Sequence, residues 1–196
     1  MKLPISLPNI LTSIRIALIP VLVMVFYLPF EWRYIAAAGI FTLAAVTDWL
    51  DGYLARRLNE MTRFGAFLDP VADKLIVAVA LVLLVEVHAS AILAVPALVI
   101  VCREIVVSAL REWMAKYSER RSVAVSFVGK IKTTFQFIAI IVLLANGPVQ
   151  GSYIVMTGYV LLYGAAVLTI WSMYLYLRIA WPDLSLGMVK NEKDPE

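Results

Sequence analysis

Apolar stretches of about 20 residues, separated by short polar or charged segments, repeat along the whole chain, and a helix of that length crosses a bilayer. The pattern predicts six transmembrane helices, over residues 9–28, 33–54, 68–87, 91–113, 127–145 and 153–179. We therefore expect an all-α integral membrane protein with a single domain over residues 1–196. Residues 1–8 are predicted to lie in the membrane interface, and residues 182–196 to form a cytoplasmic tail.

The composition agrees with this pattern, because 62% of the 196 residues are hydrophobic and only 16% are charged. The mean hydropathy is +0.87, and no soluble domain of this size is built in this way. Cys102 is the single cysteine, so no intrachain disulfide can form. The net charge of +3 is modest, and we expect no nucleic-acid partner.

The positive charges predict the orientation in the membrane. Of the 17 lysines and arginines, only Arg33 falls on the side of the loops near residues 29–33, 86–91 and 146–152. Cytoplasmic loops carry an excess of Lys and Arg, so both termini are predicted to be cytoplasmic.

One pair of aspartates lies near the end of the second apolar stretch, and another pair lies near the start of the third. Each ionised Asp near the centre of a bilayer costs ~2.5–3.5 kcal/mol, so their presence there needs compensation. Asp48 and Asp51 are spaced i,i+3 and share one helix face. Asp69 and Asp73, spaced i,i+4, share a face of the next helix. The two acidic faces are predicted to converge if the helices are antiparallel neighbours.

These four carboxylates form a candidate metal site. Clustered carboxylates need a strong counter-charge, and a ligand set made only of oxygen favours Mg²⁺ or Mn²⁺. Zinc is the poorer choice, because one His and one Cys far apart cannot form a nitrogen or sulfur site. A lone Asp near a helix end is usually just solvated, but the second pair and the neighbouring Gly52, Ala55 and Arg56 favour a binding site.

This part of the chain resembles the signature of the CDP-alcohol phosphatidyltransferase family at all eight fixed positions of the spacing Asp48-x2-Asp51-Gly52-x2-Ala55-Arg56-x8-Gly65-x3-Asp69-x3-Asp73. The resemblance implies that CDP-diacylglycerol is the donor, that the four aspartates hold the metal and that Asp73 is the catalytic general base. It also implies a site for the nucleotide of the donor, formed by Asn9, Thr12, Gly52, Ala55, Arg56, Thr62 and Gly65. The spacing Asn9-x2-Thr12-x2-Arg15 is similar to the start of other family members, although Asn9 taken alone fits a helix cap.

Basic residues around the loop between the fourth and fifth stretches form a second candidate site. Arg103 and Arg111 lie ~80° apart on one helix, so both can face one pocket, and a guanidinium group matches phosphate. Together with Lys130 they predict a site for a phosphate-bearing acceptor. Positive-inside anchoring explains Lys116 and Lys132 at least as well.

The stretches at residues 103–105, 109–113, 122–126 and 129–134 resemble the bacterial phosphatidylglycerophosphate synthase branch of the same family. That resemblance implies transfer of the phosphatidyl group to glycerol 3-phosphate, which gives phosphatidylglycerophosphate and CMP. It also implies a homodimer in the bacterial cytoplasmic (inner) membrane, with its active site on the cytoplasmic side. Because the donor keeps its acyl chains in lipid, we expect a groove between helices that opens to the cytoplasmic leaflet.

Other functions stay open at this point. Inositol phosphate is an alternative acceptor that the basic residues do not exclude, whereas they disfavour serine and phosphatidylglycerol. A cation-coupled transporter would also place acids in a membrane, but all four aspartates lie toward one side and no inverted repeat is visible. Prenyltransferases hold Mg²⁺ on Asp-rich helices, but their binding of a diphosphate does not call for Gly52-x2-Ala55-Arg56 at this spacing.

Overall fold

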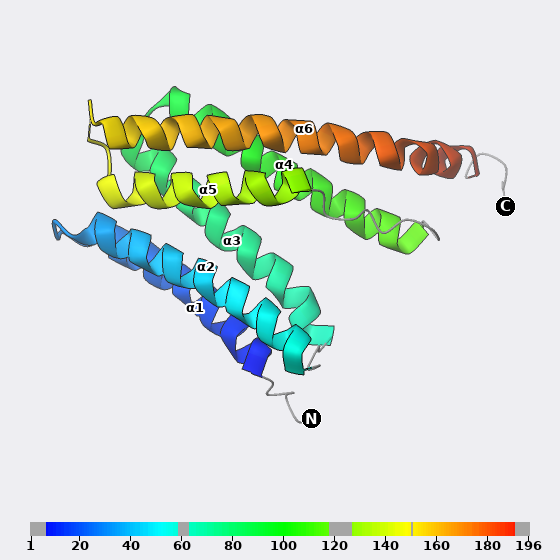
Figure 1. Ribbon diagram of the computed structural model, residues 1–196, viewed down its shortest axis with the longest axis horizontal. Coiled ribbons are helices and arrows are strands. Elements are labelled where there is room, and N and C mark those ends of the chain that lie inside the picture. Colours follow the sequence, from blue (N-terminus) through cyan, green and yellow to red (C-terminus); the bar gives the residue numbers. More distant parts are fainter. Residues whose placement is uncertain (1–6, 59–62, 118–126, 150, 191–196) are drawn as a thin grey trace.

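The computed structural model describes residues 7–58, 63–117, 127–149 and 151–190 (Figure 1). Six α-helices run through these residues, which confirms the predicted helical architecture and the number of helices. They are α1 (Leu7–Phe26), α2 (Arg33–Leu58), α3 (Arg63–His88), α4 (Ala91–Tyr117), α5 (Phe127–Asn146) and α6 (Tyr153–Lys190).

Several helices extend beyond the apolar stretches that predicted them. α2 ends at Leu58 instead of residue 54, and α3 begins at Arg63 instead of residue 68. Leu, Ala and Arg favour helix as strongly as most apolar residues do, so a helix continues after the apolar run has ended. α1 begins within the predicted interfacial segment, of which residues 1–6 lie outside the described part. α6 continues to Lys190 through most of the predicted tail, and helix propensity does not explain that extension.

Neighbouring helices are paired along most of their length. α1 packs along α2, α5 packs along α6, and the contact between α2 and α5 joins the two pairs (Figure 1). α3 crosses the bundle and packs against α1 and α4. The described chain begins and ends at one end of the bundle, which we call the terminal end. At the opposite end, which we call the turn end, residues 27–32, 89–90, 147–149 and 151–152 lie between successive helices.

The main apolar core is shared by all six helices. Its largest members with almost no exposed surface are Leu22, Phe41, Ile76, Leu81, Leu84, Leu93, Ile100, Ile140, Leu143, Leu144 and Leu162. A separate small cluster of Leu110, Met114 and Tyr176 lies between α4 and α6, closer to the terminal end. The terminal end therefore has much less apolar packing among the described residues.

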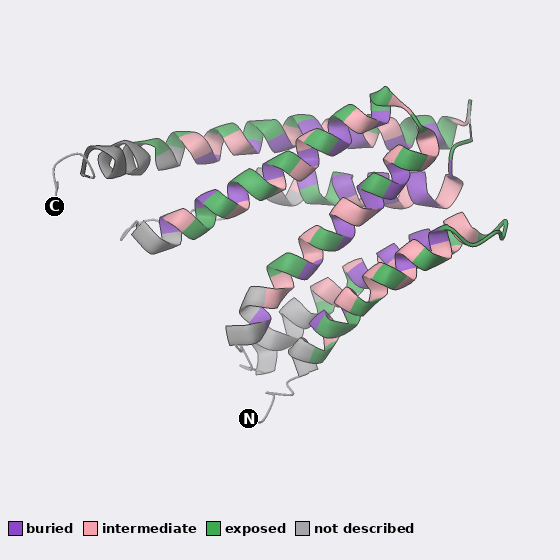
Figure 2. Cartoon of the chain, turned by 180° about the vertical axis from the view of Figure 1, so that it is seen from behind, coloured by how far each residue is buried: buried purple, intermediate pink, exposed green. Residues whose placement is uncertain are grey.

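The outer faces of the helices carry large apolar side chains (Figure 2). Val82, Leu98 and Val160, on three different helices, are 65%, 63% and 62% exposed. The spans Ala91–Met114 in α4 and Tyr153–Arg178 in α6 are long and apolar enough to cross a membrane. Such outer faces suit a lipid environment, because apolar side chains on this scale are costly to expose to water.

The turn end is fixed by a close approach between α2 and the end of α5. Gly147 has a φ of 58°, and a Cβ at this position would lie 2.8 Å from two ring carbons of Tyr34. Only glycine combines this backbone conformation with such a short approach. Tyr27 also donates a hydrogen bond of 2.6 Å to Glu86, so the ends of α1 and α3 are joined there.

Candidate active site

The first acidic helix is held by an ion pair from α1. Arg15 Nη1 lies 2.8 Å from Asp48 Oδ1 on α2. The Arg15 side chain is only 1% exposed, whereas that of Asp48 is 42% exposed. A buried guanidinium needs an anionic partner, so α1 supplies a positive charge and α2 supplies the carboxylate that offsets it.

The second acidic helix is held by the same face of α1. Thr12, which is buried, donates a hydrogen bond from Oγ1 to Asp69 Oδ1 on α3. Thr12 and Arg15 are three residues apart and therefore neighbours on one helix face. One face of α1 thus contacts an aspartate from each of the two acidic helices.

Asp73 lies one helical turn after Asp69 and is partly buried. Its carboxylate interacts electrostatically with Asp48, which repels it, and with Arg15, which attracts it. Asp48 of α2 and both aspartates of α3 are therefore grouped around the Thr12 and Arg15 face of α1. Asp48 and Asp69 thus contact the same face of α1, whereas the predicted convergence of the acidic helices on one shared site stays a prediction.

The donor atoms of this group fit a hard divalent cation, because they are carboxylate oxygens with a threonine hydroxyl beside them. Within the described part of the chain, no three acidic, His or Cys side chains lie close enough to hold an ion together. The side chain of Asp51 falls outside that part, so the site of four carboxylates stays a prediction.

Several predicted donor-site residues cannot be placed by their side chains. Gly65 is described and is buried near the start of α3. Thr62 lies outside the described residues. At Asn9, Gly52, Ala55 and Arg56 the structure describes a helical backbone but not the side chain. The same holds for Lys130 of the predicted acceptor site.

The predicted acceptor arginines both turn toward α6. Arg103 is buried, and its Nη2 donates to Ser172 Oγ at 2.9 Å. Arg111 is exposed, and its Nη2 donates to the Tyr176 hydroxyl at 2.8 Å, with the guanidinium carbon 5.1 Å from the ring centroid. Ser172 and Tyr176 are four residues apart, so both arginines contact the same face of α6. The attraction between the Arg111 guanidinium and the Tyr176 ring holds the side chain in place, and the other N–H donors of the guanidinium can bind an anion.

Three residues that the sequence did not single out join the two candidate sites. Glu104 accepts hydrogen bonds from Arg103 and Lys132. Lys74, next to Asp73, donates to Ser108, which donates to the backbone carbonyl of Glu104. Glu104 could have been found by the argument applied to the aspartates, since it is an acid within an apolar stretch. Lys74 and Ser108 carry no such signal, because their contact depends on how α3 and α4 meet.

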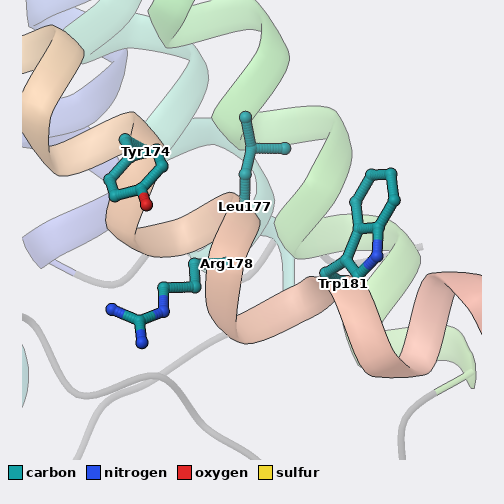
Figure 3. A pocket seen from close by; sticks show the side chains of 4 residues that line it. All are labelled: Tyr174, Leu177, Arg178 and Trp181. Carbon is teal, nitrogen blue, oxygen red and sulfur yellow. The ribbon is translucent and has the colours of Figure 1, made fainter.

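Two pockets lie away from the aspartates. One, of about 310 Å³, lies on the outer face of α6 and is lined by Tyr174, Leu177, Arg178 and Trp181 (Figure 3). The other, of about 540 Å³, lies at the turn end, where His88 faces the hydroxyl of Tyr159 at 3.2 Å. His88 thus lies at the opposite end of α3 from Asp69 and Asp73.

Comparison with known proteins supports the residue patterns described above. Residues 5–171 match the family model described as CDP-alcohol phosphatidyltransferase. A protein of Pseudomonas fluorescens named CDP-diacylglycerol--glycerol-3-phosphate 3-phosphatidyltransferase is 54% identical over 190 residues, which cover 96% of each chain. Proteins of the same name from Escherichia coli (strain K12) and Salmonella choleraesuis (strain SC-B67) are 54% and 53% identical over 179 residues, 91% of this chain and 97% of each relative. The chain belongs to the CDP-alcohol phosphatidyltransferase family.

Proposed function

We propose that the protein transfers the phosphatidyl group of CDP-diacylglycerol to glycerol 3-phosphate, which gives phosphatidylglycerophosphate and CMP. The observation that carries this proposal is the 54% identity, over 96% of the chain, to a relative named for that reaction. The grouping of Asp48, Asp69 and Asp73 beside a cluster of basic residues supports it, because the reaction needs both a phosphoryl-transfer site and an anion site.

The acidic residues act at the phosphoryl groups of the donor, CDP-diacylglycerol. Asp48, Asp51, Asp69 and Asp73 are the residues that would hold Mg²⁺ or Mn²⁺, and such an ion, when bound, offsets charge that develops on the phosphoryl oxygens. Thr12 and Arg15 keep two of these carboxylates in position from α1. The nucleotide is expected to lie against the adjoining residues Asn9, Thr12, Gly52, Ala55, Arg56, Thr62 and Gly65.

Asp73 acts on the acceptor as the general base. It takes the proton of the attacking hydroxyl of glycerol 3-phosphate, whose oxygen forms a bond to the phosphorus that carries diacylglycerol. The bond from that phosphorus to the oxygen of CMP breaks, and CMP leaves with the electron pair. Asp73 is partly buried and lies beside Asp48, and a carboxylate placed beside the attacking hydroxyl can accept its proton.

The basic residues position the acceptor. Arg103, Arg111 and Lys130 bind its phosphate group and thereby hold its free hydroxyl beside Asp73. Lys74 donates to Ser108 on α4, which keeps α3 and α4 in register at this level. Positioning of this kind converts a bimolecular encounter into a reaction within one complex and can account for much of the rate.

The two substrates also indicate where the protein lies in the cell. We expect six membrane spans, with both termini and the aspartates on the cytoplasmic side of the bacterial inner membrane, since water-soluble glycerol 3-phosphate must reach the site. The acyl chains of the donor stay in lipid, so its head group enters between helices from the cytoplasmic leaflet. A homodimer is part of this proposal.

Release of CMP by the purified full-length protein tests the function. CDP-diacylglycerol is supplied with glycerol 3-phosphate, inositol phosphate or serine in parallel reactions. We expect CMP release above background only in the reaction that contains glycerol 3-phosphate, and not with inositol phosphate or serine. Equal release with inositol phosphate would change the proposed acceptor, and no release with any of the three would overturn the proposal.

A further inference from the structure

Glu104 is the centre of a charged cluster within the bundle. Its Oε1 lies 2.7 Å from Arg103 Nη1 and 2.9 Å from Lys132 Nζ. The side chains of Arg103 and Lys132 are only 6% and 4% exposed, whereas that of Glu104 is 27% exposed. One carboxylate oxygen thus holds two buried cationic groups, one from its own helix and one from α5.

This cluster connects helices that otherwise do not meet. Among the described residues, α4 and α5 have no direct backbone packing, although each packs against α3 and α6. The bond between Lys132 and Glu104 therefore bridges α4 and α5. Arg103 extends the bridge to α6 through its bond to Ser172, which is itself buried. The two cations are fixed relative to three helices.

The cluster also lies beside the proposed base. The carboxylates of Glu104 and Asp73 are close enough to interact electrostatically. The backbone carbonyl of Glu104 accepts a hydrogen bond from Ser108, which is bonded to Lys74, the neighbour of Asp73. An anion bound by Arg103 and Lys132 would therefore lie near Asp73.

We propose that Glu104 is a positioning residue, which holds Arg103 and Lys132 in the arrangement that binds the phosphate group of the acceptor. The inference rests on the proposed function and adds Lys132 to its anion site. Two cations and one carboxylate leave one positive charge in excess, and a phosphate monoester carries about −1.5 to −2 near neutral pH.

The direction in which acceptor binding changes when Glu104 loses its charge distinguishes a positioning role from a purely electrostatic one. The negative charge of Glu104 repels a phosphate group, so its removal alone would strengthen acceptor binding. If Glu104 instead holds the two cations in place, loss of its charge weakens acceptor binding, because the carboxylate no longer attracts both cations and their mutual repulsion separates them. The variant Glu104→Gln keeps the shape of the side chain and removes only its charge.

Steady-state kinetics of the full-length protein provide the measurement. In E104Q we expect KM for glycerol 3-phosphate to rise about 10- to 100-fold, as when a residue that orients a ligand-binding group is lost. We expect KM for CDP-diacylglycerol to change less than about threefold, because the donor is assigned to the acidic residues, and kcat to change less than KM for glycerol 3-phosphate. The matched control is Glu112→Gln, two turns later on α4 and exposed, which should leave all three values unchanged.

An unchanged or lower KM for glycerol 3-phosphate in E104Q would overturn the inference. If E104Q does not fold, Glu104→Asp keeps the charge but is one methylene too short to reach both cations, and a wild-type KM in that variant would overturn it equally. Thermal stabilisation by glycerol 3-phosphate without donor is measured in parallel. If the wild type is stabilised but releases no CMP, the proposed function fails, and loss of that stabilisation in E104Q would still support the inference.

Discussion

The two ends of the bundle are built in different ways. At the turn end, large apolar side chains pack closely and Gly147 lets the end of α5 lie against Tyr34. Toward the terminal end, the described residues show only the small apolar cluster around Tyr176, and ion pairs and hydrogen bonds join the helices there. Figure 1 shows the helices close together at the turn end and spread apart toward the terminal end.

The turn end therefore contributes mainly to the stability of the fold, and the charged end contributes mainly to the reaction. Apolar packing stabilises a fold more than ion pairs do, because burying charges carries a desolvation cost that their attraction barely offsets. Charged groups that persist among apolar helices are therefore explained by the ligands that they bind. We expect changes at the turn end to alter stability, and changes at the charged end to alter turnover.

Removal of divalent cations should have the largest effect. With excess EDTA we expect CMP release to fall to background, because the charge on the phosphoryl oxygens is then no longer offset. Added Mg²⁺ or Mn²⁺ should restore it, and release of CMP is the measurement. Full activity in chelator would contradict the proposed metal site.

Replacement of the proposed base should have the next largest effect. Asp73→Asn keeps the size of the side chain but cannot accept the proton, so we expect kcat to fall by about 10²- to 10⁴-fold. Binding of CDP-diacylglycerol, measured by thermal stabilisation, should persist. The control is Glu86→Gln at the turn end, which should leave kcat unchanged. Near-normal turnover in D73N would remove Asp73 as the base.

A change in the acceptor site should be smaller and selective. Arg111→Ala removes a guanidinium group that is held over Tyr176, and we expect KM for glycerol 3-phosphate to rise about tenfold, the loss of roughly one charge-assisted contact. KM for the donor should change little. Arg178→Ala on the outer face of α6 is the matched control (Figure 3). Equal weakening of both substrates would argue against a role in acceptor recognition.

The smallest effect on turnover is expected from the turn end. Gly147→Ala forces a left-handed backbone on alanine, which costs about 1–2 kcal/mol, and also brings its Cβ against Tyr34, so the melting temperature should fall. Turnover per folded molecule should stay normal. Gly151→Ala isolates the backbone cost, because Gly151 also has a positive φ of 76° but no neighbour within 4 Å of its Cβ position. Equal melting temperatures for the two variants would contradict the close approach.

The number of helices could be predicted from the sequence, because each apolar run of bilayer length forms one helix. The grouping of Asp48 with Asp69 and Asp73 followed from their spacing on consecutive helices. The end of α6 at Lys190 could not be predicted, because the length of an apolar run predicts only the part of a helix that lies in lipid, and a helix can continue beyond it. The bridge from Glu104 to Lys132 could not be predicted either, because it depends on the register between α4 and α5, which no local pattern encodes.

The dependence of the acidic helices on α1 has a practical consequence for handling the protein. Thr12 and Arg15 reach carboxylates that lie 57 and 33 positions later in the chain, so a small displacement of the first helix is transmitted to both. A fusion partner or purification tag joined to the amino terminus would pull directly on that helix. The opposite terminus is the better place for attachment, because α6 has no backbone packing against α2 or α3 among the described residues.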